Sequence, residues 1–309
     1  MNKFKKDYSL LNGKGEWIED EHPRDEKGRF TDKESSNKEI KHENLNIDIY
    51  GINDIINLEE FVPAESISQA EEYAKNKLGV KICSYKGIEL DIANELNVAV
   101  QKGIMLCPKI KENLNFIGSL NELNNLYEKD LIDFYMKKFQ SSVPQLGNDK
   151  CLNMAKAFAE RLKIKFDNKV YAISYKKINM TYEGVKIYNK YAGVSINEVW
   201  GKDKNIILAN VKKDVEDRWH PQGCDTIKSI FDHEIGHQLD YALNLRNNKH
   251  MINLYNSISK FNKSVGLSIY SNESIQEFIA EGWTEYTNNP YPRDIAKEIG
   301  KIIKKELES

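Results

Sequence analysis

The sequence predicts a mainly helical α+β domain with a small mixed sheet and one helix that carries paired histidines. Apolar residues recur at intervals of three and four over most of the chain after residue 60, as amphipathic helices require. Two apolar runs, 169–176 and 204–212, have the length and composition of strands. A helical stretch over 232–240 reads Asp-His-Glu-Ile-Gly-His-Gln-Leu-Asp and places two histidines four residues apart.

Composition limits the classes of function. The chain has 309 residues, of which 40% are hydrophobic and 30% are charged, enough for one large domain or two small ones. Its 45 basic and 47 acidic residues give a net charge of −2, so we expect neither nucleic acid nor a membrane as a partner. No apolar run approaches the roughly 20 residues of a membrane-spanning helix. The four cysteines form no Cys-x-x-Cys pair, and this spacing excludes a cysteine zinc finger.

The first 60 residues are polar, and we expect a flexible tail there. Within it, Trp17 and Phe30 are the aromatic anchors of a turn. Residues 17–30 are similar to a His-Pro-Arg-Asp-x-x-Gly-Arg-Phe segment in tails and linkers of phage head-associated proteins. That resemblance implies docking to a phage head or to secretion machinery; a charged linker without a role of its own is the alternative.

The N-terminus is basic but has no hydrophobic segment behind it. We therefore expect synthesis in the cytoplasm without a signal peptide. Association with a virion and export by a non-classical route are both left open.

Residues 61–147 are expected to form the helical N-terminal part of the catalytic region. The pattern predicts helices over 66–78, 87–102 and 120–139, a short strand over 80–85 and a brief apolar run over 114–118. Gly103 is expected to end the second of these helices. A hinge over 141–147 leads to the remaining part, 148–309.

Residues 148–309 are expected to form the catalytic domain. Besides the two strands named above, the pattern predicts helices over 151–162, 251–265 and 293–307, the last a solvated closing element. His220 lies between Trp219 and Pro221, and Pro221 keeps the backbone extended there. We interpret His220 as a loop residue beside the cleft and not as a metal ligand.

The histidine helix is expected to have two different faces. Asp225 or Thr226 can cap its N-terminus, and its apolar stripe consists of Ile227, Phe231, Ile235, Leu239 and Ala242. His233 and His237 lie off that stripe, about 6 Å apart, so that both imidazoles can hold one metal ion. Glu234 follows the first histidine and can take a proton from water at that ion. This stretch is the predicted active-site helix.

Gly236, in the middle of that helix, costs roughly 0.5–1 kcal/mol relative to alanine. Two interpretations stay open. Another backbone approaches closely at this position, or the glycine is simply tolerated.

A catalytic zinc site takes three protein ligands and leaves one position for water. The stretch 270–286 predicts a second helix that presents Glu277 and Glu281 on one face. Glu277 is the candidate third ligand, and Glu281 can orient a ligand histidine by accepting its free N–H. Asp240, which also lies off the apolar stripe, is expected to support the metal ligands in the same way as Glu281. A solvated acidic face is the alternative for the two glutamates.

Together, His-Glu-Ile-Gly-His at 233–237, Tyr270, and Glu-Phe-Ile-Ala-Glu at 277–281 resemble the anthrax lethal factor type of catalytic domain, within the zincin metallopeptidases. That family has His-Glu-Phe-Gly-His, a downstream tyrosine and Glu-Phe-Phe-Ala-Glu at the same tyrosine-to-glutamate spacing. The resemblance implies a zincin-like fold and Zn²⁺ bound by His233, His237 and Glu277. It also implies that Glu234 is the general base, that Tyr270 stabilises the oxyanion, and that Glu281 supports a ligand.

The function implied by this resemblance is a zinc-dependent endopeptidase acting on a protein or peptide substrate. Zincins pair an extended substrate with an edge strand, which by resemblance assigns substrate binding to 205–211 and its residues Ile207, Leu208 and Ala209. A buried strand is the alternative there. Two other functions stay open, a catalytically vestigial zincin-fold binding protein of a virion or effector, and a hydrolase of a non-peptide amide. His-His-carboxylate sites also accept other first-row metal ions.

Overall fold

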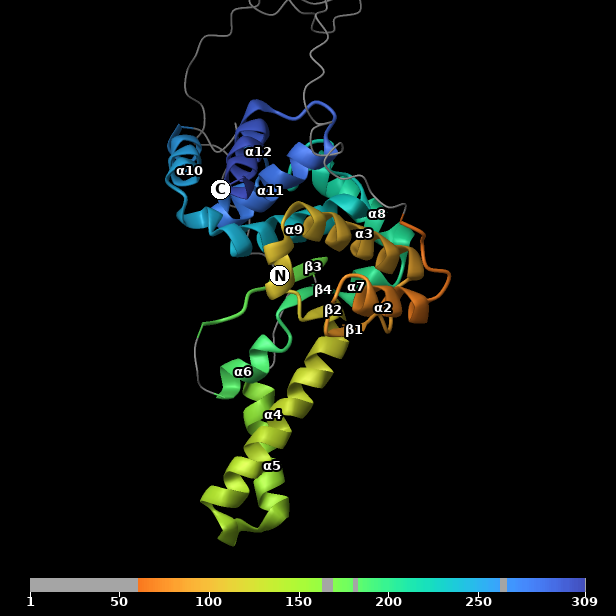
Figure 1. The fold of residues 1–309 in the computed structure, drawn as a ribbon, viewed down its shortest axis with the longest axis vertical. Helices are drawn as coiled ribbons and strands as arrows, with labels where there is room; N and C mark the ends of the chain where they lie inside the picture. The colour runs from red at the N-terminus through yellow and green to blue at the C-terminus, as the bar shows by residue number, and fades with distance from the viewer. Residues whose placement is uncertain (1–60, 163–168, 180–182, 262–265, 309) are drawn as a thin grey trace, which may run out of the picture. The chain divides into compact units, whose positions relative to one another are not determined.

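The computed structural model of the chain describes residues 61–162, 169–179, 183–261 and 266–308. The predicted tail and its segment 17–30 lie outside these described residues. Figure 1 shows the helices, which are α2 (Ile67–Asn76), α3 (Leu90–Leu106), α4 (Leu120–Ser142), α5 (Gly147–Leu162), α6 (Glu183–Asn189), α7 (Glu198–Gly201), α8 (Lys204–Glu216), α9 (Ile227–Leu243), α10 (Lys249–Phe261), α11 (Ile275–Asn288) and α12 (Asp294–Leu307). Short 3₁₀ turns cover Pro108–Glu112, Pro144–Leu146, Leu245–Asn247 and Tyr270–Asn272.

The sheet is small and mixed. Its strands are β1 (Ile82–Ser84), β2 (Phe116–Ser119), β3 (Ala172–Tyr175) and β4 (Gly193–Ile196), in the spatial order β1-β2-β4-β3. The first three strands in that order run parallel, and β3 pairs antiparallel with β4 at one edge. Strands from before and after residue 147 therefore share one sheet. The mainly helical α+β class with a small mixed sheet is confirmed.

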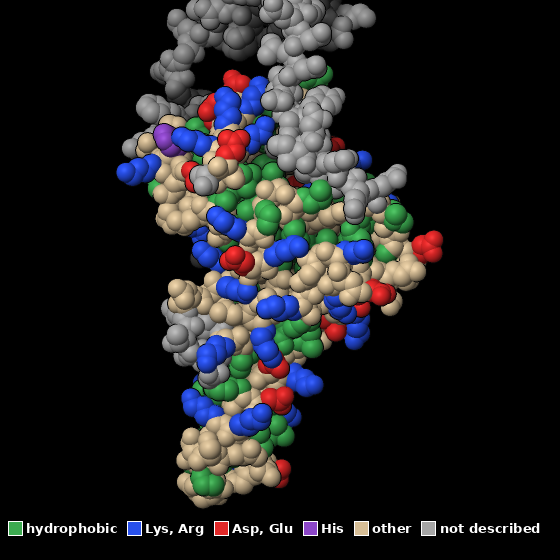
Figure 2. All heavy atoms as spheres, in the orientation of Figure 1, with side chains coloured by type: hydrophobic (Ala, Val, Ile, Leu, Met, Phe, Trp, Pro, Cys, Tyr) green, Lys and Arg blue, Asp and Glu red, His purple; other side chains and the backbone are tan. Residues whose placement is uncertain are grey.

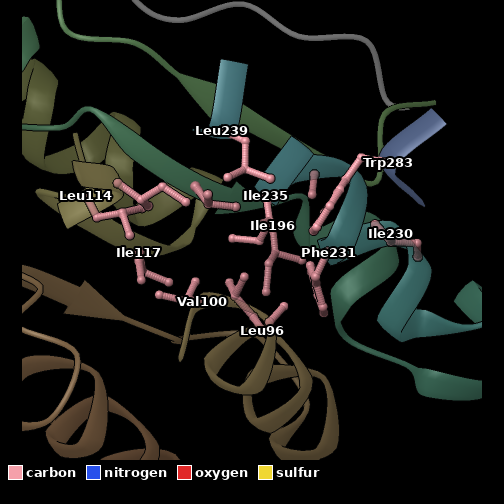
Figure 3. Packing of buried hydrophobic residues seen from close by; sticks show 14 of the residues in the cluster. Leu96, Val100, Leu114, Ile117, Ile196, Ile230, Phe231, Ile235, Leu239 and Trp283 are labelled. Carbon is pink, nitrogen blue, oxygen red and sulfur yellow. The ribbon is translucent and has the colours of Figure 1, made fainter. Parts of the chain in front are cut away.

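Helix α9 lies at the centre of the main core. It packs against α3, α11 and strand β3. Its predicted apolar stripe is buried over Ile227, Phe231, Ile235 and Leu239. Figure 3 shows Phe231, Ile235 and Leu239 of α9 among residues of α3, β2, β4 and α11. Burial of one face of α9 in this way leaves the histidines on another face.

The predicted strand 204–212 is wrong, because these residues lie on helix α8. The Asp203 side chain caps α8 by accepting hydrogen bonds from the N–H groups of Asn205 (2.9 Å) and Ile206 (3.1 Å). Only one face of this apolar run is buried, through Ile207 and Val211 at helical spacing. With Leu208 half-buried and Ala209 exposed on the same helix, residues 207–209 provide no strand edge for a substrate.

Gly103 does not end its helix, since α3 continues to Leu106. The lack of a Cβ at Gly103 allows close packing between helices instead. A Cβ at this position would lie 2.9 Å from Cγ2 of Ile235, so Gly103 lets α3 lie close against α9. Helix α12 also differs from the expectation of a solvated closing element, because it buries Ala296, Ile299 and Ile303.

Helices α4 and α5 pack against each other as an antiparallel hairpin inserted between β2 and β3 (Figure 1). A second apolar cluster joins the base of α4 to the sheet and includes Phe116, Leu120, Leu123, Tyr127 and Leu131. On the face drawn in Figure 2, acidic and basic side chains are interspersed over the described residues. Within the described parts of the chain, no helix is long and apolar enough to cross a membrane.

Candidate metal centre

Helix α9 brings its two histidines together. Its N-terminus is fixed by a reciprocal capping box between Thr226 and Ser229, which selects Thr226 from the two predicted caps. The Nε2 atoms of His233 and His237 lie 3.1 Å apart, and both rings are largely buried. Two imidazole nitrogens at this separation point at one position in space.

Helix α11 supplies the carboxylate that completes the trio. Oε2 of Glu277 lies 3.1 Å from Nε2 of His233 and 3.3 Å from Nε2 of His237. A tetrahedral zinc ion with bonds of 2.0–2.1 Å holds neighbouring ligand atoms about 3.3 Å apart. The three atoms thus form a triangle of the size that one face of a tetrahedral site needs. Among the described residues, His233, His237 and Glu277 are the group that could hold a metal ion.

Gly236 explains how the two helices approach closely enough. A Cβ at Gly236 would lie 2.8 Å from Cα and 3.3 Å from Cβ of Ala280 in α11. A larger residue at either position would separate α9 from α11, and with it Glu277 from the histidines. Of the two interpretations left open by the sequence, close approach of another backbone is confirmed.

The glutamate next to the first histidine is not part of this triangle. Glu234 is 5% exposed, and its Oε2 accepts no hydrogen bond from any of the described residues. A buried carboxylate oxygen without a partner is costly unless something else binds it. Water or a substrate group held at the metal ligands would satisfy this oxygen.

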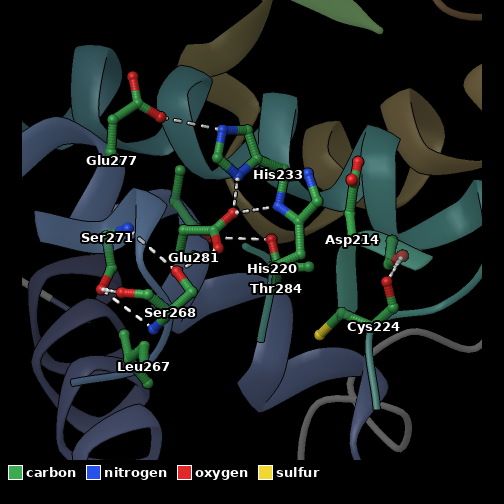
Figure 4. Close-up of polar contacts among 12 residues, drawn as sticks. Asp214, His220, Cys224, His233, Leu267, Ser268, Ser271, Glu277, Glu281 and Thr284 are labelled. Carbon is green, nitrogen blue, oxygen red and sulfur yellow. Dashed lines mark hydrogen bonds and ion pairs between the residues drawn. The ribbon is translucent and has the colours of Figure 1, made fainter. Parts of the chain in front are cut away.

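Glu281 supports the site from behind. This fully buried residue lies with Oε1 2.8 Å from Nδ1 of His233 and 3.1 Å from Nδ1 of His220, while Oε2 accepts a 2.7 Å hydrogen bond from Ser268. Figure 4 shows both imidazoles converging on this one carboxylate. Burial alone would raise the pKa of Glu281, but the two histidines lower it to about 2. The carboxylate is therefore ionised at neutral pH and holds the ring of His233 in place.

Charge coupling extends to the ligands themselves. Burial would lower the pKa of His233, but Glu277 and Glu281 outweigh burial and raise it well above the usual range. Burial has the opposite effect on Glu277, whose pKa His233 and His237 nevertheless lower well below its usual range. Without a metal ion, a proton on His233 neutralises part of this negative charge.

Tyr270 lies beside the first ligand. Its ring stacks on His233 with centroids 5.8 Å apart and an interplanar angle of 22°, and on Trp219 at 5.6 Å and 23°. Burial, followed by the carboxylates of Glu277 and Glu234, raises the pKa of Tyr270 well above its usual range. The phenol stays protonated at neutral pH and can donate a hydrogen bond.

Comparison with known proteins adds no relative to this geometry. No family model, no curated protein and no solved structure matches the chain.

Asp240 was expected to support a ligand histidine, but the structure gives it a different partner. Its fully buried carboxylate binds Arg246, accepting hydrogen bonds from the backbone N–H at 2.8 Å and from Nε at 2.6 Å, instead of orienting a ligand histidine. The contact secures the chain just after the αL residue Asn244 that ends α9. Asp240 therefore contributes to helix termination.

His220 lies closer to the candidate site than the sequence indicated. It lies on the loop before α9 and was expected only to line the cleft. In the structure its ring lies 6.0 Å from that of Tyr270 and 6.3 Å from that of His233, centroid to centroid. The sequence carries no signal for its contact with Glu281, which lies 61 positions away along the chain.

A cavity of about 260 Å³ opens beside the ligands. Its walls come from the start of β3, from α8, from the loop with His220, and from the faces of α9 and α11 next to His233. Glu234 and Tyr270 both border it. A molecule in this cavity would contact the candidate base, the phenol and one metal ligand together.

Proposed function

We propose that the protein is a zinc-dependent endopeptidase of zincin-like architecture. The observation that carries this proposal is the triangle of His233, His237 and Glu277 together with Glu234, which lines the same cavity as His233 and whose Oε2 has no partner among the described residues. Two imidazoles and one carboxylate suit zinc and leave a fourth position open. Zinc bound there would supply Lewis acidity to a substrate carbonyl and to a water molecule.

The protein's own groups then have separate tasks. Glu234 takes a proton from the attacking water and passes it to the leaving amine. Tyr270 donates a hydrogen bond from its hydroxyl to the carbonyl oxygen as negative charge develops there. One such donor stabilises the transition state by on the order of 3 kcal/mol. Glu281 holds His233 in one orientation.

The edge of the sheet offers a place for the substrate backbone. Strand β3 replaces the predicted strand at 205–211 in this role, because it is one of the two edge strands of the sheet and it packs on α9. The N–H of Asn197 donates to the carbonyl of Tyr171 at 2.9 Å, so the alternating antiparallel pattern turns the peptide groups of Ala172 and Ser174 outward. Tyr241 contacts the Ser174 carbonyl at 3.3 Å. Among the described residues no hydrogen bond reaches the outward peptide groups of Ala172, which can pair with an extended peptide.

Cleavage of a peptide mixture by the full chain tests this proposal. We expect fragments in the presence of zinc, none after chelation, and recovery when zinc is restored. Peptide binding without any cleavage would favour the vestigial binding protein instead. Turnover of other amides but not of peptides would favour the non-peptide hydrolase.

A further inference from the structure

The cavity beside the metal ligands has an apolar wall and an acidic end. Val211, Ile230 and Trp219 provide apolar surface. Asp214, on the last turn of α8, lines the same cavity, and Figure 4 shows His220 lying between it and His233. An engineered cavity of about 150 Å³ holds benzene, so about 260 Å³ is room enough for a long side chain.

Asp214 is held in position from two directions. Its Oδ2 accepts a 2.5 Å hydrogen bond from the hydroxyl of Tyr171. Its backbone carbonyl accepts from the N–H groups of Trp219 at 2.7 Å and His220 at 3.2 Å. Within the described residues no hydrogen bond reaches Oδ1 of Asp214, so this charged atom remains available as an acceptor.

His220 adds a second acceptor. In the tautomer that donates from Nδ1 to Oε1 of Glu281, 3.1 Å away, Nε2 carries a lone pair and can accept a hydrogen bond. The two nitrogens lie on different edges of the imidazole, so Nε2 points away from Glu281 and to the side where Figure 4 shows Asp214. The distal end of the cavity thus presents acceptors and a negative charge.

The charges near the cavity favour a cationic ligand. A divalent ion held by the candidate ligands would offset the carboxylates of Glu277 and Glu234. Asp214 lies beyond His220 from that ion (Figure 4). Lys169, which also lines the cavity, is exposed.

We propose that this cavity binds the side chain of a lysine or arginine next to the bond that is cleaved. The aliphatic part packs on Val211 and Ile230, and the cationic head donates hydrogen bonds to Asp214 and His220. The position next to a cleaved bond rests on the proposed peptidase function. Binding of a cationic side chain does not depend on it.

Binding of two small probes tests the cavity without any turnover. The n-butylguanidinium ion copies an arginine side chain, and n-butylurea is its uncharged counterpart of nearly the same shape. By calorimetric titration of the full-length zinc-loaded protein, we expect the guanidinium to bind about tenfold more tightly, as one charge-assisted hydrogen bond provides. Equal affinity for the two probes would overturn the proposal in favour of an apolar side chain.

Two variants test whether Asp214 causes the preference for the guanidinium probe. Asp214→Asn keeps an acceptor for Tyr171 but removes the charge, and should abolish the preference for the guanidinium. Glu216→Gln removes the same charge from an exposed position at the end of α8 and should leave the preference intact. A preference that survives in Asp214→Asn, with circular dichroism showing a folded protein, would place the cation elsewhere and contradict the proposal.

Cleavage maps then separate this inference from the proposed function. Mass spectrometry of a proteome-derived peptide mixture should place lysine or arginine at one fixed position beside the cleaved bonds. Cleavage without that preference would overturn the cavity assignment and leave the peptidase standing. If no peptide is cleaved under any condition, the peptidase proposal fails, and the probe titrations still decide what the cavity binds.

Discussion

The carboxylates of Glu234 and Glu277 are close in space but have different surroundings. Glu277 contacts both histidines, whereas the buried Oε2 of Glu234 has no partner among the described residues. This difference supports the proposal that Glu277 binds the metal and Glu234 transfers the proton. The assignment can be tested because the two roles fail in different ways.

We expect Glu234→Gln to retain zinc and to lose peptidase activity by a factor of about 10²–10⁴, the usual contribution of a general base. His233→Ala should lose both zinc and activity, since it removes a ligand. Elemental analysis alongside a peptidase assay distinguishes the two outcomes. Near-normal turnover by zinc-loaded Glu234→Gln would remove this residue from the role of base.

Protons and metal compete for the same nitrogens. Glu277 and Glu281 raise the pKa of His233 in the metal-free protein, so a bound metal must displace a proton. Zinc affinity should therefore fall as the pH is lowered, with about one proton released per ion near neutral pH. Calorimetry in two buffers of different ionisation enthalpy measures that number.

Glu281→Gln provides the matched comparison for this measurement. It removes one of the two carboxylates that stabilise the protonated ring, so the pH dependence should weaken. Zinc affinity itself should drop about 10- to 100-fold, as for other residues that orient a ligand histidine. An unchanged affinity and an unchanged pH dependence would show that Glu281 has only a structural role.

The contact between α9 and α11 depends on Gly236. Replacing it by alanine places a Cβ 2.8 Å from Cα of Ala280, and overpacking of this kind costs about 1–3 kcal/mol. The gain in helix propensity, about 0.5–1 kcal/mol, offsets only part of that. We expect Gly236→Ala to unfold at lower urea concentration and to bind zinc less tightly.

Gly300→Ala is a control for overpacking away from the ligands. Its Cβ would lie 2.7 Å from the ring of Tyr286, so a similar loss of stability is expected. Zinc affinity of the folded protein should not change, because this contact joins α11 to α12 and not α11 to α9. Equal zinc affinities in the two variants would contradict a special role for Gly236.

The edge strand β3 can be probed through its alternating peptide groups. Ala172→Pro removes an N–H that faces the open edge, a position where strands tolerate proline. We expect about a two- to tenfold rise in KM, as loss of one hydrogen bond implies, with little change in stability. Ile173→Pro removes an N–H that faces β4 and should destabilise the fold instead.

The sequence predicted the helices of the candidate metal centre well, but it predicted a strand where the structure has helix α8. His233 and His237 are held by one helix, so their spacing in the chain determines their spacing in space. Ile206, Ile207 and Leu208 have strand-like composition, but the cap at Asp203 and burial of a single face make them helical. Local patterns could not resolve this competition between propensity and packing.

At the level of the whole chain, contacts between distant residues were the least predictable. The pairing of His220 with Glu281 joins positions 61 apart, and the edge position of β3 depends on β4, which follows it in the chain. Neither leaves a periodic trace in the sequence. The class of fold was predictable because it depends on the number and type of elements and not on their partners.

The three donor atoms come from only two helices, which also touch at Gly236 and Ala280. A metal ion held between them would cross-link α9 to α11, so zinc should raise the urea concentration at which the protein unfolds.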